Sequence, residues 1–163
     1  MRRVAVVVAA LVVLAACGDD DALSLDDYFA ELAAAGQAYR AAGDVVEAGL
    51  DQTTDPLTDV KRLLPDFEPE LDGFIEKLEG MAAPDAAAAA HDRAVTAGRA
   101  AADAYDDLLA GLEDITDLNG LMAFFEGPEF TAFGAAGERF SAACGALQTV
   151  ADEENVDVDL NCG

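Results

Sequence analysis

Apolar residues recur at alternating intervals of three and four along four long segments of this chain. Such a period places the apolar side chains of each segment on one face of an α-helix. The segments cover residues 24–50, 56–80, 84–113 and 128–154. Because short breaks separate the first three segments, consecutive helices are expected to run antiparallel. The sequence therefore predicts an all-α fold, a four-helix bundle with up-down-up-down connectivity.

The third connection, residues 114–128, is the longest in the predicted bundle. An apolar stretch within it, residues 118–125, predicts a short extra helix that covers one end of the bundle. The length of this connection also leaves open a bundle whose fourth helix crosses over to a different position.

Prolines and glycines interrupt two of the predicted helices. Pro65 and Pro69 lie inside the second segment, and a proline there removes a backbone hydrogen bond. The apolar stripe keeps its phase across both prolines, so we predict one kinked helix and not two separate helices. Gly36 and Gly43 lie on the apolar face of the first segment, where glycine lowers the helix propensity. We therefore expect a neighbouring helix to approach closely at these two positions.

The N-terminus differs from the rest of the chain because two arginines precede an unbroken apolar run at residues 4–16. This run has 13 residues, whereas a helix needs roughly 20 to cross the core of a bilayer. A basic start, a short apolar segment and small residues before a cleavage point are typical of a secretory signal.

The run closes on the motif L-A-A-C, which ends at Cys17 and resembles the lipobox of bacterial lipoproteins. The resemblance implies that the thiol of Cys17 carries a diacylglycerol and that cleavage makes Cys17 the new N-terminus. It divides the chain into a signal peptide (1–16), a lipidated tether (17–23) and a helical-bundle domain (24–163). It also places the domain at the cell membrane or envelope, on the extracytoplasmic side. An ordinary secretory signal with a chance cysteine is the alternative.

Acidic residues dominate the charge, with 33 Asp and Glu against 9 Lys and Arg and a net charge of −24. Removal of the signal takes away two arginines and leaves a net charge of −26. This charge argues against nucleic acid as a partner, because phosphates are bound by clustered basic side chains. It also opposes adhesion to an anionic membrane surface. The membrane partner is therefore expected to be held by the covalent lipid on Cys17.

Cys144 and Cys162 remain as an even pair once Cys17 is lipidated. In an exported protein such a pair is expected to form a disulfide. The apolar alternation after residue 154 predicts an extended tail, which is long enough to return along the last helix. We therefore predict a C-terminal tail tied to that helix. No third or fourth soft ligand lies nearby in the sequence, so two thiols alone do not indicate a zinc site.

His91 and a group of aspartates are the candidate metal ligands. His91 is the only histidine and lies on the apolar face of the third segment. It is a candidate ligand for a metal or haem, or a general base, but we favour a buried structural histidine. Asp103, Asp106 and Asp107 crowd the end of the same segment, where carboxylates oppose the helix dipole and a cation would be favourable. A solvated acidic face is the simpler interpretation.

Phenylalanines concentrate near one end of the predicted bundle. Phe130, Phe133 and Phe140 are candidates to line an apolar ligand pocket. Phenylalanines at helical spacing belong more often to a core than to a pocket, and the core is the interpretation that we favour.

No sequence pattern joins a nucleophile to a base, so we predict that the protein is not an enzyme and has no cofactor. As a whole, the chain resembles the small, Ala- and Asp-rich helical lipoproteins of high-GC bacteria, a resemblance that carries over no active-site residues. We expect a membrane-anchored binding or scaffolding module whose partner is another envelope protein. Two alternatives remain: a cation or metal binder that uses acidic helix ends and His91, and a binder of an apolar small molecule.

Overall fold

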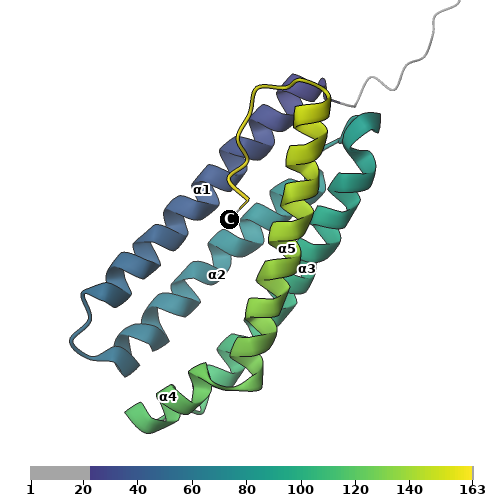
Figure 1. The fold of residues 1–163 in the computed structure, drawn as a ribbon. Helices are drawn as coiled ribbons and strands as arrows, with labels where there is room; N and C mark the ends of the chain where they lie inside the picture. Colours follow the sequence, from purple (N-terminus) through teal and green to yellow (C-terminus); the bar gives the residue numbers. More distant parts are fainter. Residues whose placement is uncertain (1–22, 163) are drawn as a thin grey trace, which may run out of the picture.

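A computed structural model describes residues 23–162 of the chain. These residues form five helices, α1 (Leu25–Asp51), α2 (Pro56–Gly80), α3 (Asp85–Glu113), α4 (Leu118–Phe125) and α5 (Pro128–Glu153). The four long helices alternate in direction, and the short α4 lies at the end where α3 leads into α5 (Figure 1). The all-α bundle, its up-down-up-down connectivity and the short extra helix are confirmed.

The predicted signal peptide and lipidation site, residues 1–16 and Cys17, lie outside the described residues. Leu23, which we assigned to the tether, already contacts the domain, because its backbone N–H donates to the Ala82 carbonyl at 3.2 Å. Within residues 23–162, no helix combines the length and the apolarity needed to cross a bilayer.

Polar caps and prolines mark where the helices begin. The Ser24 hydroxyl accepts the backbone N–H of Asp27 before α1, and the Asp117 carboxylate accepts that of Gly120 before α4. These caps satisfy N–H groups that have no partner inside the helix. α2 and α5 each begin with a proline, whose missing N–H removes no hydrogen bond at that position.

The prediction of a single helix across Pro65 and Pro69 is confirmed, since α2 continues through both. Both prolines are exposed. The buried face of α2 continues on each side of them, with Leu63 before and Leu71 after. Packing on that face holds the helix together where two backbone N–H groups are missing.

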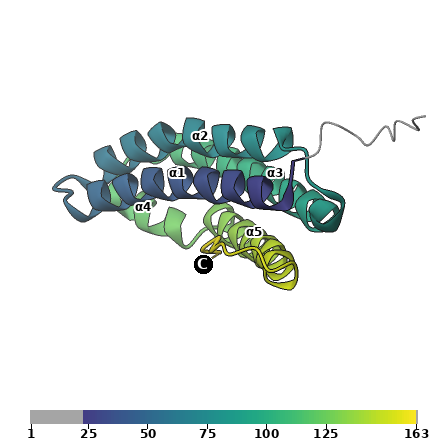
Figure 2. The ribbon, with the colours of Figure 1, turned by 90° about the horizontal axis from the view of Figure 1, so that it is seen from above.

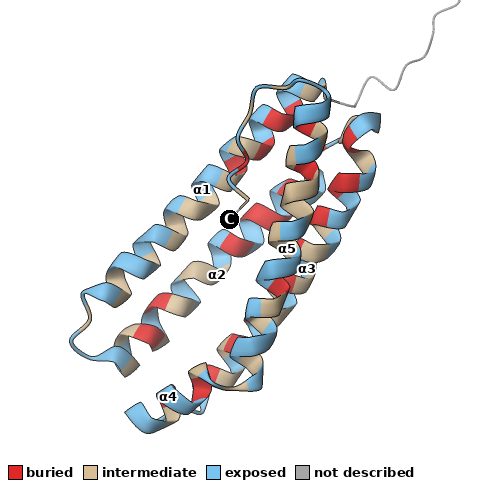
Figure 3. Ribbon diagram, in the orientation of Figure 1, coloured by how far each residue is buried: buried red, intermediate tan, exposed pale blue. Residues whose placement is uncertain are grey.

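Neighbouring helices pack in the order α1, α2, α3 and α5, whereas α1 and α5 hardly contact each other directly. In the side view the C-terminal tail lies between α1 and α5 (Figure 1), and from above it overlies α5 (Figure 2). Buried residues follow the inward faces of the helices (Figure 3). The largest fully buried side chains are Tyr28, Phe29, Leu78, Leu108, Leu121 and Leu147.

The tail after α5 returns along that helix, as predicted, and is covalently tied to it. A disulfide joins Cys144 to Cys162, whose Cα atoms are 5.4 Å apart. Leu160 of the tail is buried, with 4 % of its surface exposed. Among the described residues the tail pairs with no strand. The backbone N–H groups of Val156 and Val158 donate to nearby backbone carbonyls, and side chains bind several of the other backbone groups of the tail.

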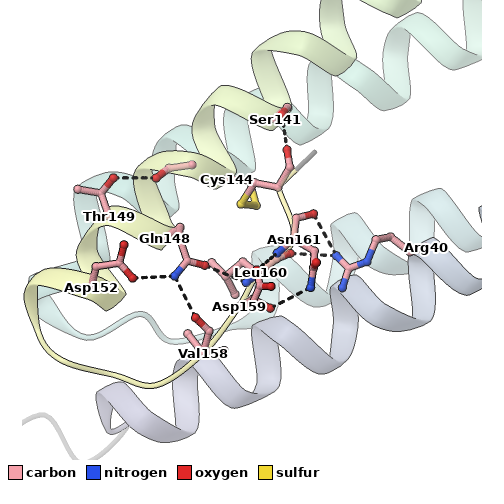
Figure 4. Close-up of a disulfide and its surroundings, with 12 residues drawn as sticks. Arg40, Ser141, Cys144, Gln148, Thr149, Asp152, Val158, Asp159, Leu160 and Asn161 are labelled. Carbon is pink, nitrogen blue, oxygen red and sulfur yellow. Dashed lines mark hydrogen bonds between the residues drawn. A yellow bond between two sulfur atoms is a disulfide. The ribbon is translucent and has the colours of Figure 1, made fainter.

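Side chains of α5 bind the backbone of the tail (Figure 4). The amide Nε2 of Gln148 donates to the Val158 carbonyl, and its Oε1 accepts the backbone N–H of Leu160, each at 2.9 Å. The Ser141 hydroxyl donates to the carbonyl of Cys162. These contacts fix the path of the tail over the bundle.

Gly36 and Gly43 do not mark a close approach of helices, so that expectation is wrong. A Cβ atom at Gly43 would lie 4.0 Å from the nearest side chain, and one at Gly36 would meet only Arg40 of the same helix. The tightest position between helices is Gly98 in α3, where a Cβ atom would lie 2.7 Å from the Ile75 side chain. Gly49 in α1 follows, 2.9 Å from Leu63 of α2. A glycine packed against a neighbouring helix and a glycine beside open space can both fall on the apolar face at helical spacing. The spacing alone therefore does not show which glycine marks a close approach.

Candidate functional site

A cavity of about 310 Å³ lies between α1 and α5 and is bordered by the C-terminal tail. Residues from α1, α2, α3, α5 and the tail form its walls, which are mostly apolar. The apolar and small residues among them are Leu32, Gly36, Tyr39, Phe74, Leu78, Ala94, Gly137, Phe140, Cys144, Leu147, Leu160 and Cys162, and the polar ones are Arg40, Ser141 and Asn161. Pockets that bind small molecules are typically about 300–1,000 Å³ and lined in the same way.

Small residues leave this space open. Gly137 in α5 has no other heavy atom within 4 Å of where a Cβ atom would stand. Gly137 shares a helix face with Ser141 and Cys144, four and seven positions later, and all three line the cavity. Ala94 of α3 and Gly36 of α1 also contribute little side-chain volume. Small residues on three helices, α1, α3 and α5, thus form part of the cavity wall.

Arg40 is the one charged side chain among the residues that line the cavity. Its Nη1 donates to the carbonyls of Leu160 and Asn161 at 2.9 and 3.5 Å. The same atom lies over Gly36, 3.3 Å from the position of a Cβ atom there. No carboxylate within residues 23–162 lies within 4.0 Å of the guanidinium. Within the described residues, the cation is thus held at the cavity by neutral backbone carbonyls.

The other titratable groups at the cavity are uncharged near neutral pH. Burial raises the pKa of Tyr39, whose ring stacks on Phe74 with centroids 5.0 Å apart. Cys144 and Cys162 form the disulfide. The electrostatic character of the cavity therefore depends on Arg40.

The three phenylalanines proposed for a pocket are only partly brought together. Phe140 lines the cavity, and Phe133 joins it around a smaller adjoining space of about 50 Å³. Phe130 lies apart, with 39 % of its surface exposed, and its ring packs on Phe125 with centroids 5.2 Å apart. The cavity therefore lies closer to the C-terminus of α5 than the phenylalanine-rich start of that helix does.

His91 is buried, with 7 % of its surface exposed. Its Nδ1 and the Tyr28 hydroxyl lie 2.9 Å apart in a buried hydrogen bond that links α3 to α1. Burial lowers the pKa of His91, and the neighbouring Asp92 opposes this only in part. Burial also raises the pKa of Tyr28 to about 12. The pair is therefore neutral and structural, and His91 does not line the cavity.

Asp103, Asp106 and Asp107 are all exposed on α3. Among residues 23–162, no three His, Cys, Asp or Glu side chains gather closely enough to hold a metal ion. His91 also lies about three to four turns before these aspartates on the same helix. The cation-binding alternative therefore finds no assembled ligand set in this part of the chain.

The burial of His91 predicts a pH-dependent loss of stability. Its pKa is lowered in the folded chain, whereas the unfolded chain keeps a value of about 6.5. The unfolded state therefore takes up the proton first as the pH falls. The contribution of His91 is complete above about pH 6.5 and is lost as the pH falls through the folded pKa.

Urea unfolding at pH 7.5 and 5.5 tests this expectation. Between the two pH values, the free energy of unfolding should fall more for the wild type than for the variant His91→Asn. The asparagine keeps a hydrogen-bonding group near Tyr28 but does not titrate. Comparison with the variant removes the contribution of the many carboxylates. Equal losses in the two proteins would show that His91 is not the titrating group.

Sequence reasoning missed Arg40, although one signal for it was present. Arg40 follows Gly36 by one helical turn, so the two residues lie on the same side of the first helix. A basic residue beside an apolar face stands out in a chain with 33 acidic residues. Its contact with the tail, 120 positions away, has no local sequence signature.

Compared with protein-family models, with curated proteins and with solved structures, the chain matches none of them.

Proposed function

We propose that this chain is a lipid-anchored, extracytoplasmic binding protein whose helical bundle holds an apolar small molecule. The observation that carries the proposal is the apolar cavity of about 310 Å³ between α1 and α5. Its size and lining are those of a small-molecule pocket. The lipobox supports the anchor at Cys17, and the disulfide of Cys144 and Cys162 suits an oxidising compartment outside the cytoplasm.

Binding, and not catalysis, is the role that these residues support. Ser141 is the one hydroxyl of a serine or threonine at the cavity, and it donates to the carbonyl of Cys162. The single histidine of the chain is paired with Tyr28 and does not line the cavity. A serine nucleophile needs a base within hydrogen-bond reach. We therefore propose a binding module that is not an enzyme.

Filling the cavity tests the proposal. The variant Gly137→Leu places a branched side chain in open space on the face that lines the cavity. It is expected to weaken binding of the neutral apolar dye Nile red by roughly tenfold or more, because losing 1.4 kcal/mol of contact energy already has that effect. Fluorescence titration of the soluble domain measures the change. The domain can begin at Gly18, since the core, the disulfide and the cavity all lie within residues 23–162.

Gly134→Leu is the matched control. Gly134 lies on the same helix, is exposed, and also has no heavy atom within 4 Å of a Cβ position, but it does not line the cavity. Both substitutions raise the helix propensity, so a difference between them reports on the cavity. Equal Nile red affinities for the two variants, or no binding by the wild type, would contradict the proposed function.

A further inference from the structure

We infer that the cavity binds a single-chain amphiphile with an anionic head, namely a fatty acid of medium length. Its carboxylate would sit on the Arg40 guanidinium and its alkyl chain would fill the apolar space. This inference rests on the proposed binding function and adds the chemical class of the ligand.

The charge at the cavity selects the head group. Asp and Glu outnumber Lys and Arg by 33 to 9 in the whole chain, yet among residues 23–162 the only charged residue that lines the cavity is an arginine. Within this part of the chain an anionic head therefore meets one cation and no Asp or Glu carboxylate on the cavity wall. A cationic head would be attracted to the acidic outer surface, but the positive charge of Arg40 would repel it at the cavity.

The hydrogen bonds of Arg40 leave donors for a ligand. Its Nη1 is engaged by the carbonyls of Leu160 and Asn161. Its Nε and Nη2 make no hydrogen bond within residues 23–162. A guanidinium presents its N–H groups as a planar fork that matches the two oxygens of a carboxylate. The tail thus holds the guanidinium through the carbonyls of Leu160 and Asn161 (Figure 4), and no other residue of 23–162 engages the rest of the fork.

The volume of the cavity sets the length of the alkyl chain. A buried cavity of about 150 Å³ holds one benzene molecule. The cavity here, about 310 Å³, is about twice as large, so it accommodates roughly a dozen carbon atoms. Its walls include the rings of Phe74 and Phe140 and the side chain of Leu147, which offer no polar atom to a ligand. A saturated chain of about twelve carbons suits this space.

Three probes with the same alkyl chain test the inference by isothermal titration calorimetry on the domain beginning at Gly18. The probes are dodecanoate, dodecanol and dodecyltrimethylammonium, the two ionic ones below their micelle-forming concentrations and dodecanol below its solubility limit. We expect dodecanoate to bind most tightly. The variant Arg40→Gln should weaken dodecanoate binding by about tenfold or more, because hydrogen bonds to charged groups are strong. It should leave the affinity for dodecanol within about twofold, a change below 0.5 kcal/mol.

Two further variants separate charge from structure. Arg93→Gln is the matched control, because Arg93 is exposed on α3 and, like Arg40, donates to a backbone carbonyl. It should leave the affinities for all three probes unchanged. Arg40→Lys keeps the positive charge and should bind dodecanoate more tightly than Arg40→Gln does. If the loss of Arg40 only loosened the tail, dodecanol binding would fall as much as dodecanoate binding, and that result would overturn the inference.

The outcomes also separate this inference from the proposed function. Tighter binding of dodecyltrimethylammonium than of dodecanoate, or equal dodecanoate binding by wild type and Arg40→Gln, would overturn the anionic head. The proposed function would still stand if Gly137→Leu abolished binding of Nile red and dodecanol. If none of the probes bound and Gly137→Leu had no effect on Nile red, both would fall.

Discussion

Replacing Cys17 by serine is expected to abolish the incorporation of radiolabelled palmitate into this protein. The thiol is a far better nucleophile than a serine hydroxyl near neutral pH, and the proposed diacylglycerol transfer depends on it. Acyl chains contribute about 0.8 kcal/mol per buried methylene, so a multiply acylated protein stays on the membrane. The net charge of −24 offers no electrostatic substitute on an anionic surface. Labelling of growing cells, followed by immunoprecipitation and membrane fractionation, measures both effects.

The double variant Cys144→Ser, Cys162→Ser is the matched control for this experiment. It makes the same chemical change at the two other cysteines of the chain. It should keep the palmitate label and stay in the membrane fraction. An unlabelled wild type, or a Cys17→Ser protein that still carries palmitate, would disprove the proposed anchor.

The same double variant is expected to lose about 3 kcal/mol in free energy of unfolding. The disulfide closes a loop between positions 18 apart in the sequence. Without it, the unfolded chain gains conformational freedom, which favours unfolding. Urea unfolding of the soluble domain, followed by circular dichroism, gives the midpoint and the slope for each protein.

Reduction provides an internal control for that measurement. With dithiothreitol present, the wild type should unfold at the urea concentration that unfolds the double variant. Adding the reductant to the double variant should change nothing. A double variant as stable as the oxidised wild type would mean that Gln148, Ser141 and Arg40 hold the tail without help from the disulfide.

The helices were predictable because their signals are local. The period of apolar residues, the prolines at helix starts and the breaks between segments are read within a few turns of chain. The short helix appears at Leu118–Phe125, within the bounds that its apolar run indicated. The continuity of α2 across Pro65 and Pro69 also followed from the phase of its stripe.

The register of the buried faces was less predictable than the helices themselves. In α3, Ala94 and Leu108 are buried, whereas the neighbouring Val95 and Leu109, which are larger or equal in size, are only half-buried. Close packing of two helices favours small side chains at the centre of the contact. A hydrophobicity scale ranks valine above alanine. It therefore predicts that Val95, and not Ala94, lies at the centre of the buried face of α3.

The cavity could not be derived from sequence because it depends on contacts between distant parts of the chain. It requires α1 and α5 to stand apart, the tail to enter between them, and Leu160 to be buried there. Phe130 was a reasonable candidate by spacing, but it lies in the first turn of α5, where it packs on Phe125. The helical period shows which residues share a face of one helix. It does not show how far that face lies from the next helix.

The position of the chain ends orients the molecule on its proposed anchor. The start of α1 and the turn after α5 lie at one end of the bundle, and α4 lies at the other (Figure 1). Leu23 follows Cys17 by six positions, a distance of at most about 20 Å. α1 has 27 residues and rises about 40 Å. If Cys17 carries the proposed lipid and the bundle stands on this end, the exposed Leu118 and Met122 of α4 would face away from the membrane.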